Sequence, residues 1–137
     1  MTILLADDDR VMRTLTATFL KRSGFEMLYA QDAAQVLQMV KNIIPDMFIL
    51  DIMMPGISGI DLCRTLRAHE ATRETPVIML SSLNDPQTVS NCLNAGASAF
   101  LCKSDMQLLP AIVKKFICPS TPNPMPRQEF QAGVDVK

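Results

Sequence analysis

The feature that most constrains this chain is the strict alternation of short apolar runs with segments of helical period. The apolar, β-prone runs fall at residues 3–6, 25–30, 47–50, 77–80 and 99–102. After each run, apolar residues return every three or four positions, which is typical of an amphipathic helix. This alternation predicts an α/β fold: a five-stranded parallel sheet with right-handed crossovers and helices on both faces.

Each predicted helix has an apolar face and recognisable ends. Asp32 is a candidate N-cap, Pro86 fits a first helical turn and Gly24 suits a helix C-terminus. The predicted inward faces, in chain order, are Val11, Leu15 and Phe19; Ala33, Val36, Leu37, Val40 and Ile44; Leu62, Cys63 and Leu66; Val89, Cys92 and Leu93; and Leu109, Ile112, Val113 and Phe116.

The amino-acid composition and the positions of the prolines predict the domain organisation. With 48% hydrophobic and 20% charged residues, the chain has the balance of a compact globule rather than a disordered one. Residues 1–117 carry the periodic pattern and are predicted to form one domain. Residues 118–137 contain Pro119, Pro122, Pro124 and Pro126 without apolar periodicity, which predicts a tail or linker.

The same composition argues against several classes of partner and compartment. A net charge of −1 gives no broad basic surface, so we expect no direct nucleic-acid contact. No apolar run approaches the ~20 residues of a membrane helix, and no signal peptide is visible, so a cytoplasmic protein is expected. The four cysteines lie far apart, which favours reduced thiols (Cys63, Cys92, Cys102 and Cys118).

Polar side chains stand where four of the predicted strands end. Asp7 and Asp8 follow the first strand, Asp51 the third, Ser81 the fourth and Lys103 the fifth. In open parallel sheets, ligands bind beyond the carboxyl ends of the strands. Each residue alone has an ordinary explanation as a cap, turn or exposed side chain. Their occurrence together at one sheet edge predicts a functional site.

The chemistry of this set points to phosphoryl transfer. Three carboxylates in one cleft repel one another unless a cation neutralises them, and Mg²⁺ suits carboxylates, waters and a phosphate oxygen together. Lys103 and Ser81 could hold phosphoryl oxygens, while Asp51, on the central strand, is best placed as the nucleophile.

At these residues the sequence closely resembles the receiver domains of two-component response regulators, in the chemotaxis-regulator-like superfamily. The resemblance covers about residues 1–117 and is carried by residues 3–9, 48–56, 76–82 and 96–103. It implies a flavodoxin-like receiver fold with strand order 2-1-3-4-5. It further implies a regulatory phosphoacceptor, not an enzyme in the usual sense, that assists its own phosphorylation and dephosphorylation.

The resemblance also implies a metal site and a phosphoacceptor. Asp51 matches the residue that receives phosphate from a histidine kinase or a histidine phosphotransfer protein. Asp8, Asp51 and the backbone carbonyl of Met53 would bind Mg²⁺, with Mn²⁺ as an alternative ion. Asp7 would act mostly through a bound water.

Three further residues match the family's phosphoryl-binding and switching positions. Lys103 would contact the phosphoryl group, Ser81 would move toward it, and Phe100 would turn in response. As partners beyond the phosphodonor, the resemblance implies a receiver homodimer and a downstream effector domain or protein.

Departures from the family pattern occur at three residues. Ser104 stands where a proline is usual, which favours a trans peptide bond there and a different setting for Lys103. Met53 and Leu83, two residues beyond Asp51 and Ser81, are apolar and occupy positions that tune hydrolysis of the acyl phosphate. We therefore expect slow self-dephosphorylation.

Three other classes of protein compete with this interpretation. A haloacid-dehalogenase-type phosphatase would need a second acid where Met53 stands. A flavin-binding module would need a Ser/Thr/Gly-rich loop after the first strand, where three acids stand instead. A receiver fold that only docks partners remains a rival; it would not respond to a phosphodonor.

Overall fold

The computed structural model of the chain describes residues 1–117. Its elements, in chain order, are β1 (Thr2–Ala6), α1 (Arg10–Lys21), β2 (Glu26–Ala30), α2 (Ala33–Met39), β3 (Met47–Asp51), α3 (Gly59–Ala68), β4 (Val77–Ser81), α4 (Pro86–Asn94), β5 (Ala99–Cys102), the 3₁₀ helix η1 (Lys103–Leu108) and α5 (Leu109–Phe116). The strands form one sheet in the order β2-β1-β3-β4-β5, and all neighbouring pairs are parallel. The predicted fold class and strand order are confirmed.

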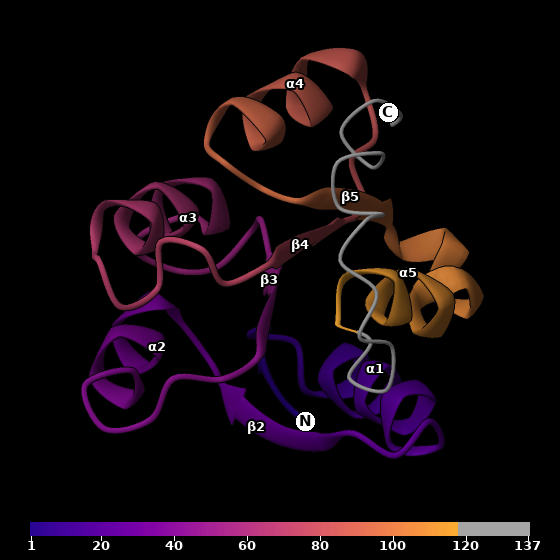
Figure 1. The fold of residues 1–137 in the computed structure, drawn as a ribbon. Coiled ribbons are helices and arrows are strands. Elements are labelled where there is room, and N and C mark those ends of the chain that lie inside the picture. The colour runs from indigo at the N-terminus through magenta and orange to yellow at the C-terminus, as the bar shows by residue number, and fades with distance from the viewer. Residues whose placement is uncertain (118–137) are drawn as a thin grey trace, which may run out of the picture.

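Helices cover both faces of the sheet, and each face has its own apolar core (Figure 1). On one face, α2, α3 and α4 pack against side chains of the central strands, with Phe48, Leu50 and Met79 fully buried. On the other face, α1 and α5 enclose a second cluster that includes Ile49 and Ile78. Successive residues of β3 and β4 therefore serve opposite cores, which explains why these strands are apolar at nearly every position.

Strand burial follows position in the sheet. All residues of β3 and β4 are buried, whereas the edge strands β2 and β5 are partly exposed. The polar exceptions in the central strands are Asp51 and Ser81, which are the last residues of β3 and β4. Burial of these two groups at the carboxyl edge locates the part of the sheet where function is expected.

The predicted apolar face of the first helix was wrong at two of its three residues, whereas the third, Phe19, packs partly buried against the second core. Val11 is 73% and Leu15 44% exposed, while α1 buries Thr16, Ala17 and Leu20. Small side chains let the helix approach the sheet closely, and the Thr16 hydroxyl donates to the carbonyl of Met12 at 2.7 Å, so its burial leaves no unpaired polar group.

Three other residues expected to face inward are exposed. Helix α2 ends at Met39, so Ile44 lies beyond it and is 45% exposed. Leu93 on α4 is 49% and Phe116 on α5 37% exposed. Each of these helices buries only a narrow face against the sheet. The fully buried residues are Cys92 on α4 and Leu109 and Val113 on α5.

The predicted helix ends are confirmed. The Asp32 side chain accepts from the backbone of Gln35, Pro86 is in the first turn of α4, and Gly24 has a φ of 90° after α1. Within residues 1–117 no helix is long and apolar enough to cross a membrane.

The thiols inside the described part of the chain are free. Cys63 and Cys92 are buried, and burial raises the pKa of both, to about 11 for Cys92, which disfavours the reactive thiolate. Cys102 is partly exposed. Cys118 and the predicted tail, 118–137, lie outside the described residues.

Candidate functional site

The strand register brings the polar ends together. Ala6 on β1 is level with Leu50 on β3, so Asp7 and Asp51 each stand one residue further along adjacent strands. Asp51 is level with Leu80, which places Ser81 one step beyond it on β4. Ser81 is level with Cys102, so Lys103 stands one residue beyond Ser81, at the end of the neighbouring strand β5. Parallel pairing thus gathers groups from four separate stretches of chain.

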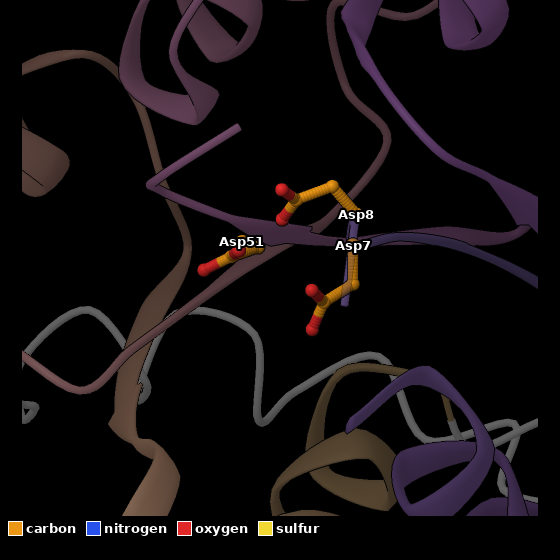
Figure 2. A group of neighbouring side chains, drawn as sticks. All are labelled: Asp7, Asp8 and Asp51. Atoms are coloured by element: carbon orange, nitrogen blue, oxygen red, sulfur yellow. The ribbon is translucent and has the colours of Figure 1, made fainter. Parts of the chain in front are cut away.

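Three carboxylates converge at this edge, as Figure 2 shows for Asp7, Asp8 and Asp51. One oxygen of each lies within 4.8 Å of the others. Asp7 is fully buried and Asp51 is 4% exposed, whereas Asp8 is exposed. The cluster therefore has two desolvated acids and one that faces solvent.

A lysine partly balances these acids. The Lys103 ammonium lies 3.2 Å from Oδ1 of Asp51 and 3.4 Å from Oδ2 of Asp7, with its side chain only 17% exposed. One cation therefore faces two buried carboxylates, and Asp8 adds a third negative charge nearby. The described residues of the site carry an excess of negative charge.

The pKa values express this imbalance. Burial, followed by the charge of Asp7, raises the pKa of Asp51 from 3.8 to about 6, although Lys103 and the Met53 backbone act in the opposite direction. Burial alone would lower the pKa of Lys103, but the carboxylates of Asp51 and Asp7 outweigh it and raise this pKa. The lysine stays charged, while Asp51 is held in an unfavourable ionised state.

One buried oxygen at the site has no hydrogen bond. Oδ1 of Asp7 accepts from the Asp9 backbone at 2.9 Å, but Oδ2 has no hydrogen-bond partner; Lys103 only approaches it as an ion pair. A buried carboxylate oxygen without a hydrogen bond is costly, and a positive ligand bound there would lower that cost. Together with the excess negative charge and the all-oxygen donor set, it fits a hard divalent cation such as Mg²⁺.

Ser81 ends β4 at this edge, whereas Phe100 lies two residues before the end of β5. Ser81 is fully buried, and its hydroxyl oxygen accepts from the Leu83 backbone at 2.9 Å, so its own O–H remains able to donate. Phe100 on β5 is level with Met79 and packs, partly buried, against the core of the α2–α3–α4 face.

The two apolar residues next to the site are exposed. Met53 is 61% and Leu83 45% exposed, and each follows a site strand by two residues. Neither side chain can hydrogen-bond strongly to a water.

Lys103 reaches the site although Ser104 replaces the proline usual after it. Lys103 is the first residue of η1, and the exposed Ser104 hydroxyl donates to the Cys102 sulfur at 3.2 Å. Ser104 therefore bonds locally, away from the carboxylates, while the ammonium contacts Asp51 and Asp7.

Two residues that support the site were not identified as site residues from the sequence. Gly59, the first residue of α3, lies so close to the Asp51 backbone that a Cβ would stand 2.2 Å from its carbonyl oxygen. Arg13 on α1 donates from Nη1 to the Asp7 carbonyl at 2.8 Å. A glycine at a helix start is a recognisable signal of close approach, but nothing in the sequence marks Arg13.

A doubly wound parallel sheet with a buried aspartate, an acidic cluster and a lysine at its carboxyl edge defines a class of regulatory phosphoacceptor domains. The chain belongs to the response regulator receiver domain family, whose sequence pattern matches residues 3–114. Receiver domains of two-component systems accept a phosphoryl group and bind Mg²⁺ in an acidic pocket.

Two curated relatives illustrate the sequence similarity. The DNA-binding response regulator MtrA of Mycobacterium tuberculosis is 36% identical over 101 residues, which are 74% of this chain and 43% of that protein. The phosphate regulon transcriptional regulatory protein PhoB of Pseudomonas aeruginosa is 35% identical over 102 residues, 74% of this chain and 44% of PhoB. The matched region thus spans less than half the length of these relatives.

Solved structures show the same fold. A putative response regulator from Chloroflexus aurantiacus superposes with a TM-score of 0.81 at 32% identity, covering 84% of this chain and 95% of that one. The chemotaxis protein CheY4 of Vibrio cholerae gives 0.79 at 23% identity, with 85% and 98% covered, which supports the fold alone.

Proposed function

We propose that Asp51 is the residue that accepts the phosphoryl group, from a histidine kinase or a histidine phosphotransfer protein. The observation that supports this most is its ion pair with Lys103, 3.2 Å away, beside two other carboxylates. An Asp51 carboxylate oxygen would attack phosphorus as the P–N bond of a phosphohistidine breaks. The histidine nitrogen keeps the electron pair and takes up a proton, and Asp51 becomes an acyl phosphate.

The neighbouring residues have separate tasks in this proposal. Asp7, Asp8, Asp51 and the Met53 carbonyl would hold Mg²⁺, which when bound offsets the negative charge of the incoming phosphate. Lys103 would exchange part of its contact with Asp51 for a phosphoryl oxygen. The Ser81 O–H would donate to another phosphoryl oxygen, and Phe100 would turn into the space that Ser81 leaves.

A small-molecule phosphodonor tests the assignment. Incubation with acetyl phosphate and Mg²⁺ should add the mass of one phosphoryl group to the intact protein, and Asp51→Ala should show none. Asp46→Ala serves as the control, because Asp46 precedes β3 at the opposite edge of the sheet, where it accepts from the Thr2 backbone. A wild-type chain that gains no mass from acetyl phosphate and does not respond to beryllofluoride would indicate a docking module instead.

The output of the switch belongs to the same proposal. We infer residues 1–117 to be the receiver domain and residues 118–137 its linker or tail, acting in the cytoplasm on an effector domain or protein. A receiver homodimer would be one form of output. Sedimentation with and without beryllofluoride would detect it.

Loss of the phosphoryl group should be slow in the wild type and faster in Met53→Asn. Met53 is 61% exposed and apolar, whereas an asparagine amide at this position could orient a water toward the acyl phosphate. One added hydrogen bond of about 1 kcal/mol corresponds to roughly a fivefold rate increase. Radiolabel decay measures the rate. Met53→Leu should decay like the wild type, and an unchanged rate in Met53→Asn would contradict this role.

A further inference from the structure

Arg13 bonds to the backbone of the acidic cluster rather than to one of its carboxylates. It lies in the first half of α1, where its own N–H donates to the Asp9 carbonyl at 2.9 Å. Helical side chains lean toward the helix N-terminus, which brings the half-buried guanidinium back over the end of β1. There Nη1 donates to the Asp7 carbonyl at 2.8 Å.

With this contact, the backbone N–H, the backbone carbonyl and one carboxylate oxygen of Asp7 all have hydrogen-bond partners. Its N–H donates to the Ala30 carbonyl on β2 at 3.1 Å, and its Oδ1 accepts from the Asp9 N–H at 2.9 Å. Its carbonyl, held by Arg13, belongs to the peptide group that leads into Asp8. Because that peptide is planar, the direction of the Asp7 carbonyl sets the plane from which Asp8 departs.

Asp8 needs such support more than the other acids. Asp51 ends a fully buried strand and Asp7 is fully buried itself, whereas Asp8 is exposed and lies in no strand or helix. Even so, its carboxylate oxygen lies within 4.8 Å of those of Asp7 and Asp51.

We propose that Arg13 is a positioning residue that orients the Asp7–Asp8 peptide, so that the Asp8 carboxylate faces Asp51 and completes the cation site. The inference rests on the proposed magnesium site. It assigns to Arg13 no contact with metal or phosphate. Its action passes through one backbone hydrogen bond.

Simple electrostatics makes the opposite prediction. A guanidinium near a cation site repels the cation, so removal of its charge should tighten Mg²⁺ binding. If Arg13 instead orients the ligands, removal should weaken binding, since loss of the groups that orient metal ligands costs about tenfold or more in affinity. The sign of the change therefore separates the two effects.

The experiment is a calorimetric Mg²⁺ titration of the full chain without any phosphodonor. Arg13→Met keeps the apolar stem and removes the donor, Arg13→Ala removes both, and Arg13→Lys keeps a charged donor. Arg10→Ala is the matched control, because Arg10 is an exposed arginine at the start of the same helix. The Asp8 amide resonance of the metal-free protein reports the Asp7 carbonyl hydrogen bond independently of metal.

We expect about tenfold weaker Mg²⁺ binding in Arg13→Met and Arg13→Ala, with a shifted Asp8 amide. Arg13→Lys should recover most of the affinity, and Arg10→Ala should bind Mg²⁺ as tightly as the wild type or more so. Equal or tighter binding in Arg13→Met and Arg13→Ala would overturn the inference. A wild-type chain that binds no Mg²⁺ would instead refute the proposed metal site.

Discussion

Replacing Asp51 with asparagine should stabilise the metal-free protein at neutral pH. The ionised carboxylate is buried beside Asp7, and its pKa is raised from 3.8 to about 6, so its charge opposes folding. This rise corresponds to about 3 kcal/mol, which we reduce to about 2 kcal/mol because the cluster includes the exposed Asp8 and is therefore partly screened by solvent. Chemical denaturation of both proteins in EDTA at pH 7.5 measures the difference.

The effect of Asp51 on the free energy of unfolding depends on pH. Between about pH 4 and 6, the folded protein keeps the Asp51 proton that the unfolded chain has already released. The Asp51 contribution to the free energy of unfolding therefore falls as pH rises through this window and is unfavourable above it. The advantage of Asp51→Asn should appear over this range and be absent below about pH 4.

Asp85 offers a control of opposite sign. Hydrogen bonds from the Thr88 side chain and backbone lower the pKa of Asp85, the exposed N-cap of α4, so its contribution is lost as pH falls. Asp85→Asn should thus show no gain in stability at neutral pH.

Saturating Mg²⁺ should stabilise the wild type more than it stabilises Asp51→Asn. An Asp51→Asn protein no more stable than the wild type in EDTA would contradict the proposed charge imbalance.

Gly59→Ala should destabilise the fold although alanine is the better helix former. Helix propensity alone would favour the substitution by about 1 kcal/mol. In the structure, however, the new Cβ would stand 2.2 Å from the Asp51 carbonyl oxygen and 3.0 Å from Cα of Ile52, which are backbone atoms at the end of β3 and just beyond it. Overpacking of this kind costs about 3 kcal/mol.

The same collision should reduce phosphorylation. The Gly59 N–H donates to the Ile52 carbonyl at 2.9 Å, so α3 can move away only by pulling the loop that follows Asp51. Gly24→Ala is the comparison: a Cβ there meets nothing within 4 Å, and only its φ of 90° is unfavourable, at about 1 kcal/mol. A Gly59→Ala protein as stable as the wild type, with unchanged acetyl phosphate uptake, would refute the close approach.

Most of the fold was predictable because its signals are local. Apolar runs of strand length and the caps at Asp32 and Pro86 depend on neighbouring residues, and they located every strand of residues 1–117 to within a residue or two. The errors concern which helix faces are buried and, at Ile44, where a helix ends. On α1, two neighbouring faces of the helix compete for the sheet. The face with Val11 and Leu15 is the more apolar of the two, but these residues are exposed. Thr16 and Leu20, on the other face, are buried.

The residues that form the candidate site could be predicted from the sequence, but the interactions between them could not. Parallel strands must bring Asp7, Asp51, Ser81 and Lys103 to one edge, and the register does so. Spacing along the chain cannot show that Lys103 contacts two carboxylates, or that one oxygen of Asp7 is left without a hydrogen bond. Those facts depend on distances across strands.

The parallel α/β architecture and the kinds of group at its carboxyl edge follow from the amino-acid sequence alone, because strand length, helical period and strand-end chemistry are properties of consecutive residues. The burial of each helix face, the size of the rise in the Asp51 pKa, and the contacts of Gly59 and Arg13 with the site become visible only in the folded structure. The physical reason is that burial, electrostatic coupling and close approach arise between segments far apart in the chain. They exist only once the strands have paired.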